Sequence, residues 1–310
     1  MTDRSKGDDR IMSSPWENFY REHKSSLIAM AYRLTGSWAE AEDIVQETFT
    51  SLLETPAAFE QVRNPLPYFR QAVVNRSLNV LKSPRFSRET YPGTWLPEPL
   101  FQTATETDHS VLHEEQVSYA FMVMLEQLSP EERAVMVLRE SFAVDYQEIA
   151  AILDKSEAAC RKLLSRARNK LARSGLEETK VPGDRVSAWV QAFLQASRQG
   201  EFTPLLAMIR EDAVLWSDGG GKVRSALRPI FTRERIMAFW NGITRKGSMA
   251  GELVPVRLNG DWGLLLYQQG RPVKAIAFEG DAQGQIRNMY LVTNPDKLAM
   301  APPLSLPLTH

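Results

Sequence analysis

Residues 145–173, DYQEIAAILDKSEAACRKLLSRARNKLAR, predict two short helices joined by a tight turn. Asp145 followed by Glu148 is a capping-box start for the first helix, and Ser156 is a suitable N-cap for the second. Apolar residues of the second helix recur at helical spacing, so that they form one face: Cys160, Leu164, Ala167 and Leu171. The stretch is therefore a candidate helix-turn-helix.

The second helix of this hairpin is strongly basic. Residues 155–173 contain seven Lys or Arg and one acid, Glu157. A basic helix after a short turn is what insertion into the major groove of DNA requires. The stretch favours DNA binding, and the alternative is an ordinary helical hairpin with a solvated basic face.

Charge is unevenly distributed along the rest of the chain. The 310 residues allow two or three domains, and their formal net charge is −1. Residues 63–88 carry six Lys or Arg and no acid, whereas acids concentrate in residues 40–54. Because electrostatic attraction acts within about 10 Å, basic patches can bind phosphate although the total charge is near zero.

The sequence predicts a cytoplasmic protein. Cys160 is the single cysteine, so a disulfide framework is excluded and a reducing compartment is favoured. The polar N-terminus does not resemble a signal peptide. No run of about 18 apolar residues is present to span a membrane.

Residues 12–85 predict consecutive helices. Gly36 is a plausible C-cap, and Ser37 with Glu40 starts the next helix. The helix over residues 38–54 is amphipathic, and its exposed side is acidic and glutamine-bearing: Asp43, Gln46 and Glu47. On spacing alone, we interpret this acidic side of the helix as a solvated surface.

The helix that follows Pro67 interleaves aromatic, basic and amide side chains. Such a surface suits the bases of an exposed nucleic-acid strand, which stack on aromatic rings and need hydrogen-bonding partners. A core stripe with solvated positive charges fits the same pattern equally well. The polar residues in question are Arg70, Asn75, Arg76 and Asn79.

Two blocks of the chain resemble bacterial sigma factors of the extracytoplasmic-function class. GSWAEAEDIVQETF and PLPYFRQAVVNRSLNVLKS resemble region 2, and LSPEERAVMVLRESFAVDYQEIAAILDKSEAACRKLLSRARNKL resembles region 4. The resemblance covers about residues 12–85 and 114–174. It implies two all-α domains, over residues 12–85 and 114–175, that direct RNA polymerase to promoters.

The resemblance also implies roles for particular residues. Asp43, Gln46 and Glu47 would dock on the β′ subunit of the RNA polymerase core, which also contains the β subunit. The residues that contact the −10 element of promoter DNA would be Arg70, Asn75, Arg76 and Asn79. The residues facing the −35 element of promoter DNA would be Ser156, Glu157, Arg161, Lys162, Ser165 and Arg166.

Residues 86–113 read as an extended linker, in which Pro97 and Pro99 add stiffness. The resemblance implies a flexible joint here. However, an exposed linker rarely keeps Trp95-Leu96 and Leu100-Phe101 close together. This cluster predicts docking, either on the polymerase or on another part of the chain.

Residues 184–298 predict an α+β domain, with a tail over 299–310. We expect Asp184 to cap a helix and residues 213–216 to form a strand. Asn259-Gly260-Asp261 predicts a hairpin between two further strands. Helices followed by paired strands indicate a curved antiparallel sheet with a cavity.

Three short motifs accompany this domain: WLPEP at 95–99, DGGGK at 218–222 and NPDKL at 294–298. Together they resemble the sigma-factor subgroup with a fused, cone-shaped SnoaL-like domain, which takes the place of an anti-sigma protein. The implied regulatory contacts between domains involve Trp95, Leu96, Pro97, Asp218, Gly219, Gly220, Gly221, Lys222, Asn294, Pro295 and Asp296.

Catalysis by the third domain is not expected. Residues 184–309 contain no His or Cys, and Asp218 is the best candidate acid. DGGGK lacks the GxxxxGK[ST] phosphate-loop spacing, because Val223 follows Lys222. We expect no metal, no cofactor and no catalytic residue, while an unidentified small-molecule ligand stays open.

Two other functions remain open on sequence grounds. One is a ligand-responsive regulator that uses only the helix-turn-helix. The other is a SnoaL-like enzyme with a DNA-binding appendage. The regulator should bind duplex DNA tightly without polymerase, and the enzyme should show turnover in residues 184–310.

Overall fold

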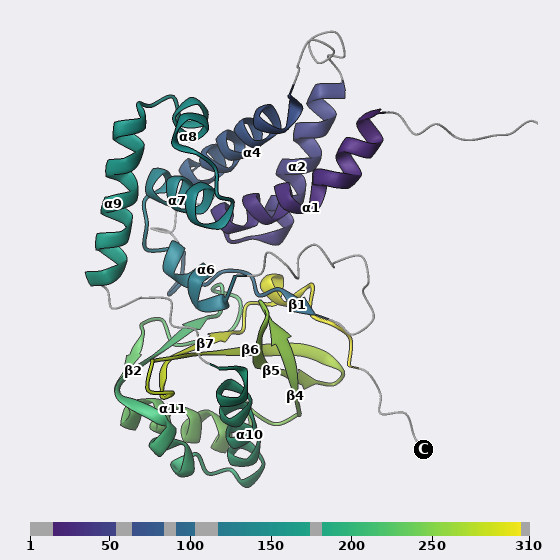
Figure 1. The fold of residues 1–310 in the computed structure, drawn as a ribbon. Coiled ribbons are helices and arrows are strands. Elements are labelled where there is room, and N and C mark those ends of the chain that lie inside the picture. The colour runs from purple at the N-terminus through teal and green to yellow at the C-terminus, as the bar shows by residue number, and fades with distance from the viewer. Residues whose placement is uncertain (1–14, 54–63, 84–90, 103–116, 174–181, 305–310) are drawn as a thin grey trace, which may run out of the picture.

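The computed structural model describes residues 15–53, 64–83, 91–102, 117–173 and 182–304 (Figure 1). Helices form the N-terminal part, and a sheet with its own helices forms the C-terminal part. None of the helices in these ranges is long and apolar enough to cross a membrane.

Two groups of helices make up the N-terminal part. The first group is α1 (Pro15–Thr35), α2 (Trp38–Leu53) and α4 (Pro65–Lys82). The second is α6 (Tyr119–Leu125), α7 (Pro130–Met136), a π-helical turn (Val137–Ser141), α8 (Tyr146–Leu153) and α9 (Glu157–Arg173). One hydrophobic cluster runs from Leu27 in α1 to Leu171 in α9. The two groups therefore share a core.

Short capping signals fix the ends of these helices. Gly36 follows α1 with φ 72°, a backbone conformation that glycine adopts without strain. The Asp145 carboxylate accepts a hydrogen bond from the Glu148 amide at 2.7 Å, and the Ser156 hydroxyl accepts one from the Ala159 amide at 3.2 Å. The predicted starts of α8 and α9 are confirmed. The predicted buried face of α9 is confirmed too: Cys160, Leu164, Ala167 and Leu171.

Arg133 of α7 joins the two helix groups. Its buried guanidinium donates to the Leu34 carbonyl of α1 at 2.7 Å and pairs with Glu126 at 2.8 Å. Burial lowers the pKa of Arg133 to about 9. The contact satisfies a carbonyl at the end of α1 that has no partner within the helix.

A seven-stranded sheet organises the C-terminal part, in the order β1-β4-β5-β6-β7-β2-β3. Its strands are β1 (Phe101–Gln102), β2 (Ile209–Asp218), β3 (Ile230–Phe231), β4 (Glu252–Leu258), β5 (Asp261–Gln268), β6 (Arg271–Gly280) and β7 (Ile286–Val292). Its helices are α10 (Gly183–Gln199), α11 (Arg233–Arg245) and two 3-10 helices, Thr203–Met208 and Pro295–Leu298.

The sheet differs from the sequence expectation in its pairing. β2 runs parallel to β7, so the sheet is mixed rather than antiparallel. The reason is the long connection through β3 and α11, which takes the chain to the far side before β4–β7 return as a meander. Asp184 is not an N-cap, because α10 begins one residue earlier and Pro182 occupies that position. The strand expected at residues 213–216 extends over the whole of β2.

The two faces of the sheet pack on different partners. α10 and α11 cover one face, with Phe193 and Trp240 in its core. The other face packs on Leu96 of the linker and Tyr119 of α6. Figure 1 shows the sheet between α10 and α11 on one side and the N-terminal helices on the other.

The described part of the linker, residues 91–102, is bound along the C-terminal domain. It ends in β1, where Phe101 pairs with Leu258 of β4. The Leu100 amide donates to the Asn259 side chain at 3.0 Å, and the Asn259 amide donates back to the Leu100 carbonyl at 2.8 Å. This segment therefore adds an edge strand to the sheet of another domain.

Candidate functional site

Asp218, the last residue of β2, is fully buried and makes four hydrogen bonds through its carboxylate. One oxygen accepts from the Leu96 amide at 2.9 Å and from Lys297 Nζ at 2.7 Å. The other accepts from the Tyr91 hydroxyl at 2.6 Å and from the Gly220 amide at 2.9 Å. One side chain thus joins the linker, the glycine loop at residues 219–221 and the last 3-10 helix (Pro295–Leu298).

Lys297 supplies the positive charge of this junction. Its ammonium also donates to the Leu96 carbonyl, so Leu96 is held through both its amide and its carbonyl. The ammonium lies 3.9 Å from the centre of the Trp95 ring and 5.1 Å from that of Tyr91, which adds cation–π attraction. The pair with Asp218 is buried, and each partner makes further hydrogen bonds, so its charges are compensated.

The glycine loop lets the chain segments approach closely. Gly220 and Gly221 have φ 63° and 70°. A Cβ at Gly220 would lie 2.4 Å from the Asn294 side chain, and one at Gly221 would lie 2.8 Å from Pro92. Asn294 in turn donates to the Tyr91 hydroxyl at 3.0 Å. A larger residue at position 220 would displace Asn294, and one at position 221 would displace the linker at Pro92.

Around this centre, the remaining motif residues have lesser roles. Lys222 pairs with Asp296 at 2.5 Å, and both side chains are exposed. Pro295 opens the last 3-10 helix, and Asn294 caps it through a hydrogen bond from the Asp296 amide at 3.1 Å. A Cβ at Gly219 would lie 2.2 Å from the Val223 carbonyl. The WLPEP, DGGGK and NPDKL motifs thus meet in one set of contacts, which we call the junction.

The linker contacts the N-terminal helices from its other side. A Cβ at Gly36 would lie 2.5 Å from the Trp95 ring. The buried Glu98 carboxylate accepts hydrogen bonds from the Trp38 amide at 2.8 Å and the Ser37 hydroxyl at 3.3 Å. It thereby occupies the N-terminus of α2, where a negative charge is favoured. Burial raises the pKa of Glu98, against the lowering effect of these hydrogen bonds.

Tyrosine hydroxyls complete the contacts of the linker backbone. Tyr32 of α1 donates to the Glu98 carbonyl at 2.7 Å and accepts from Asn259 at 3.0 Å. Tyr119 of α6 donates to the Pro97 carbonyl at 2.7 Å. Burial raises the pKa of both tyrosines. The linker therefore lies between the helical part and the sheet and is hydrogen-bonded to each.

The residues expected to bind polymerase lie on the exposed face of α2. Asp43, Gln46 and Glu47 line a surface hollow together with Arg76 of α4. Arg76 donates to Glu47 at 3.1 Å and to Ser51 at 2.8 Å. The structure thus brings one expected −10 residue against the expected polymerase surface.

The other expected −10 residues have separate environments. Arg70 pairs with Glu148 of α8 at 3.1 Å. Beside it, Gln71 donates to the Ala151 carbonyl at 3.3 Å. Asn75 and Asn79 are exposed. Part of α4 is therefore covered by the second helix group.

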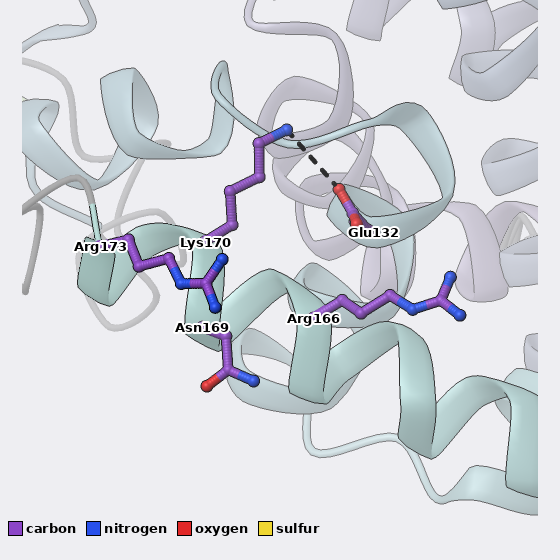
Figure 2. A pocket seen from close by; sticks show the side chains of 5 residues that line it. All are labelled: Glu132, Arg166, Asn169, Lys170 and Arg173. Atoms are coloured by element: carbon purple, nitrogen blue, oxygen red, sulfur yellow. Dashed lines mark ion pairs between the residues drawn. The ribbon is translucent and has the colours of Figure 1, made fainter.

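All the residues expected at the −35 element are exposed, on α9 or, for Ser156, at the cap that precedes it: Ser156, Glu157, Arg161, Lys162, Ser165 and Arg166. Arg161 pairs with Glu157 at 2.6 Å and stacks over Tyr146 at 4.3 Å. Figure 2 shows a further hollow near the end of this helix, where Lys170 lies 3.9 Å from Glu132 of α7. Its lining is largely basic: Glu132, Arg166, Asn169, Lys170 and Arg173.

Several residues that bind the linker were not predicted from the sequence. Glu98 and Lys297 belong to the WLPEP and NPDKL motifs, and their charge was the signal that could have identified them. The sequence predicted Asn259 only as part of a hairpin turn, but its side chain is also hydrogen-bonded to Leu100 and Tyr32. Tyr32 carries no sequence signal that distinguishes it from a core residue. Within the described ranges, no cluster of three or more His, Cys, Asp or Glu is placed to hold a metal ion.

Comparisons with known proteins agree with this arrangement. The family model "Sigma-70 region 2" matches residues 19–86, and "Sigma-70, region 4" matches residues 118–171. The chain is 31% identical to the ECF RNA polymerase sigma factor SigJ of Mycobacterium tuberculosis, over 91% of this chain and 92% of that protein. It is 29% identical to the probable ECF RNA polymerase sigma factor SigI of the same species, over 61% and 65%.

A crystal structure of SigJ from Mycobacterium tuberculosis has the same architecture. It matches with a TM-score of 0.74 and 28% identity. The match covers 92% of this chain and 99% of the other. The two helical parts and the C-terminal helix-and-sheet domain are therefore shared with a solved sigma factor.

Proposed function

Because the chain belongs to the extracytoplasmic-function family of RNA polymerase sigma factors, we propose that its C-terminal domain regulates it by holding the linker between its sigma regions. Sigma factors act in transcription initiation. A regulator that used only the helix-turn-helix would not account for the match to region 2.

The partners in this proposal are the polymerase core, through β′ and β, and promoter DNA. Asp43, Gln46 and Glu47 dock on the core, and their exposure on α2 supports this role. Phosphate contacts give salt-sensitive affinity, and base contacts select the promoter. The −10 residues are Arg70, Asn75, Arg76 and Asn79, and the −35 residues are Ser156, Glu157, Arg161, Lys162, Ser165 and Arg166.

The contacts of the junction carry the regulatory part of the proposal. Leu96 is bound through its amide by Asp218 and through its carbonyl by Lys297. With the linker held, α4 and α8 stay in contact through Arg70 and Glu148. In this proposal the two sigma regions separate in order to bind the two promoter elements. Release of the linker would permit this separation.

Run-off transcription with purified core polymerase tests the proposal. Trp95→Ala removes a ring that contacts both Lys297 and Gly36, so we expect altered transcript yield with both sigma regions still folded. A chain ending near Gly183 should show the same direction of change. Unchanged yield and unchanged contacts between domains would contradict regulation, and no transcript from any form would contradict a sigma function.

A small-molecule ligand in the C-terminal domain is a second part of the proposal. Trp240 Nε1 and Thr244 Oγ1 of α11 are buried and lack hydrogen-bond partners among the described residues. Lys274 is buried on the same side of the sheet, since it pairs with Leu266 in that core. Burial lowers the pKa of its ammonium. These donors suit a ligand that accepts hydrogen bonds.

Native mass spectrometry of the full-length protein tests this ligand. We expect a bound mass on the wild type that is lost in Lys274→Met, while the folded charge-state distribution is unchanged. A bare protein mass in both forms would contradict the ligand. The proposal assigns no reaction to the domain, and turnover by residues 184–310 would overturn that assignment.

A further inference from the structure

Residues 222–235, KVRSALRPIFTRER, form an exposed segment with both apolar and basic side chains. The segment leaves β2, includes β3 at the edge of the sheet and enters α11. Of the five large apolar residues most exposed in the described ranges, three lie here. They are Val223, Leu227 and Phe231, with exposed fractions of 41%, 67% and 53%.

The positive charge of the C-terminal domain is concentrated in this segment. Residues 184–304 contain fifteen Lys or Arg and eleven Asp or Glu. The segment holds five of these cations and one of these acids, so the rest of the domain has ten of each. The whole positive excess of the domain therefore lies in fourteen residues.

Most of this charge is not neutralised by neighbouring acids. Lys222 pairs with Asp296, and Arg233 pairs with Glu234. Arg224, Arg228 and Arg235 are exposed and make no ion pair or hydrogen bond with the described residues. Unpaired, exposed arginines that recur within one short segment are typical of phosphate binding.

The segment also lies directly against the linker. A Cβ at Gly93 would lie 3.3 Å from Leu227, and Gly221, which precedes the segment, packs on Pro92. The linker joins the region that handles the −10 element to the region that faces the −35 element. Nine residues separate the end of α9 from the start of α10. This short connection keeps the segment near DNA bound by α9 even after the linker is released.

We propose that residues 222–235 bind the phosphate backbone of promoter DNA as a third DNA-contacting surface, in addition to regions 2 and 4. Arg224, Arg228 and Arg235 supply the phosphate contacts. Leu227 and Phe231 lie in the same segment, and they are exposed apolar side chains of the kind that minor-groove proteins insert between base steps. The role goes beyond regulation through the junction, since it adds binding free energy to the open complex.

Salt-dependent binding of holoenzyme to a promoter fragment tests this role. Each phosphate contact contributes about 0.9 to the slope of log K against log salt concentration. Arg224→Gln combined with Arg228→Gln should lower that slope by about 2, with weaker binding at low salt. The matched control is Arg245→Gln combined with Lys246→Gln, which removes the same charge from the other end of α11 and should leave the slope unchanged.

An unchanged slope in the Arg224 and Arg228 variant would overturn the proposal. An equal decrease of the slope in the control variant would also overturn the proposal, because the slope would then depend on the net charge of the protein and not on this segment. Weaker binding to core polymerase at an unchanged slope would overturn it in favour of a protein-docking surface. Wild-type holoenzyme that fails to transcribe would instead contradict the sigma function itself.

Discussion

At the scale of single residues, the buried pair of Asp218 and Lys297 is the most consequential feature. Removing one partner of such a pair leaves an uncompensated charge, which costs about 3–5 kcal/mol. We therefore expect Lys297→Met to lower the free energy of unfolding by that order, measured by urea denaturation of the full-length protein. The reason is that Asp218 would keep its amide and hydroxyl donors but lose its cation.

Lys222→Met is the matched control for this prediction. Lys222 pairs with Asp296 in the same motifs, but both side chains are exposed. Exposed pairs contribute about 0–1 kcal/mol. The double variant Asp218→Asn with Lys297→Met should lower the free energy of unfolding by less than the sum of the two single changes. If Lys222→Met and Lys297→Met lowered the free energy of unfolding equally, burial of the pair would be unimportant for stability.

At the scale of elements, an ion pair between α4 and α8 adds to the shared core and to Arg133 in holding the two sigma regions together. Glu148 pairs with Arg70, and both are partly exposed, so the pair contributes at most about 1 kcal/mol. Glu148→Gln should weaken this contact and raise transcript yield by up to about fivefold. Run-off transcription at low polymerase concentration measures the change.

Glu140→Gln controls for the loss of one acid from the same helix group. Glu140 pairs with Arg168 of α9 and does not bridge to α4. We expect transcription by this variant to match the wild type. Reduced transcription by Glu148→Gln would indicate that the contact between α4 and α8 supports initiation rather than restraining it.

At the scale of the whole molecule, the proposed release of the linker would break its contacts with both neighbours. Its amides at Leu96, Glu98 and Leu100 are hydrogen-bonded to Asp218, Gly36 and Asn259. We expect hydrogen exchange at these amides to accelerate when core polymerase binds. The central strands β5 and β6 should stay protected. Protection of the linker that persists in the holoenzyme would contradict release.

Sequence signals were most reliable where local chemistry decides the outcome. The starts of α8 and α9 followed from Asp145 and Ser156, and the buried face of α9 followed from helical spacing. The hairpin between β4 and β5 followed from Asn259-Gly260, whose φ values of 48° and 85° suit a tight turn. The charged motif residues Glu98 and Lys297 were visible, but their partners were not.

The sequence by itself determined the order of elements and the family, because capping, periodicity and short motifs act over a few residues. Only the tertiary structure decided that β2 lies parallel to β7, that β1 joins a distant sheet and that Lys297 meets Asp218. These pairings join residues far apart in the chain, and their free energy comes from burial and charge compensation after folding. For the helix-turn-helix at residues 145–173, helical spacing alone predicted which side of α9 is buried, and the fold placed α8 against α4.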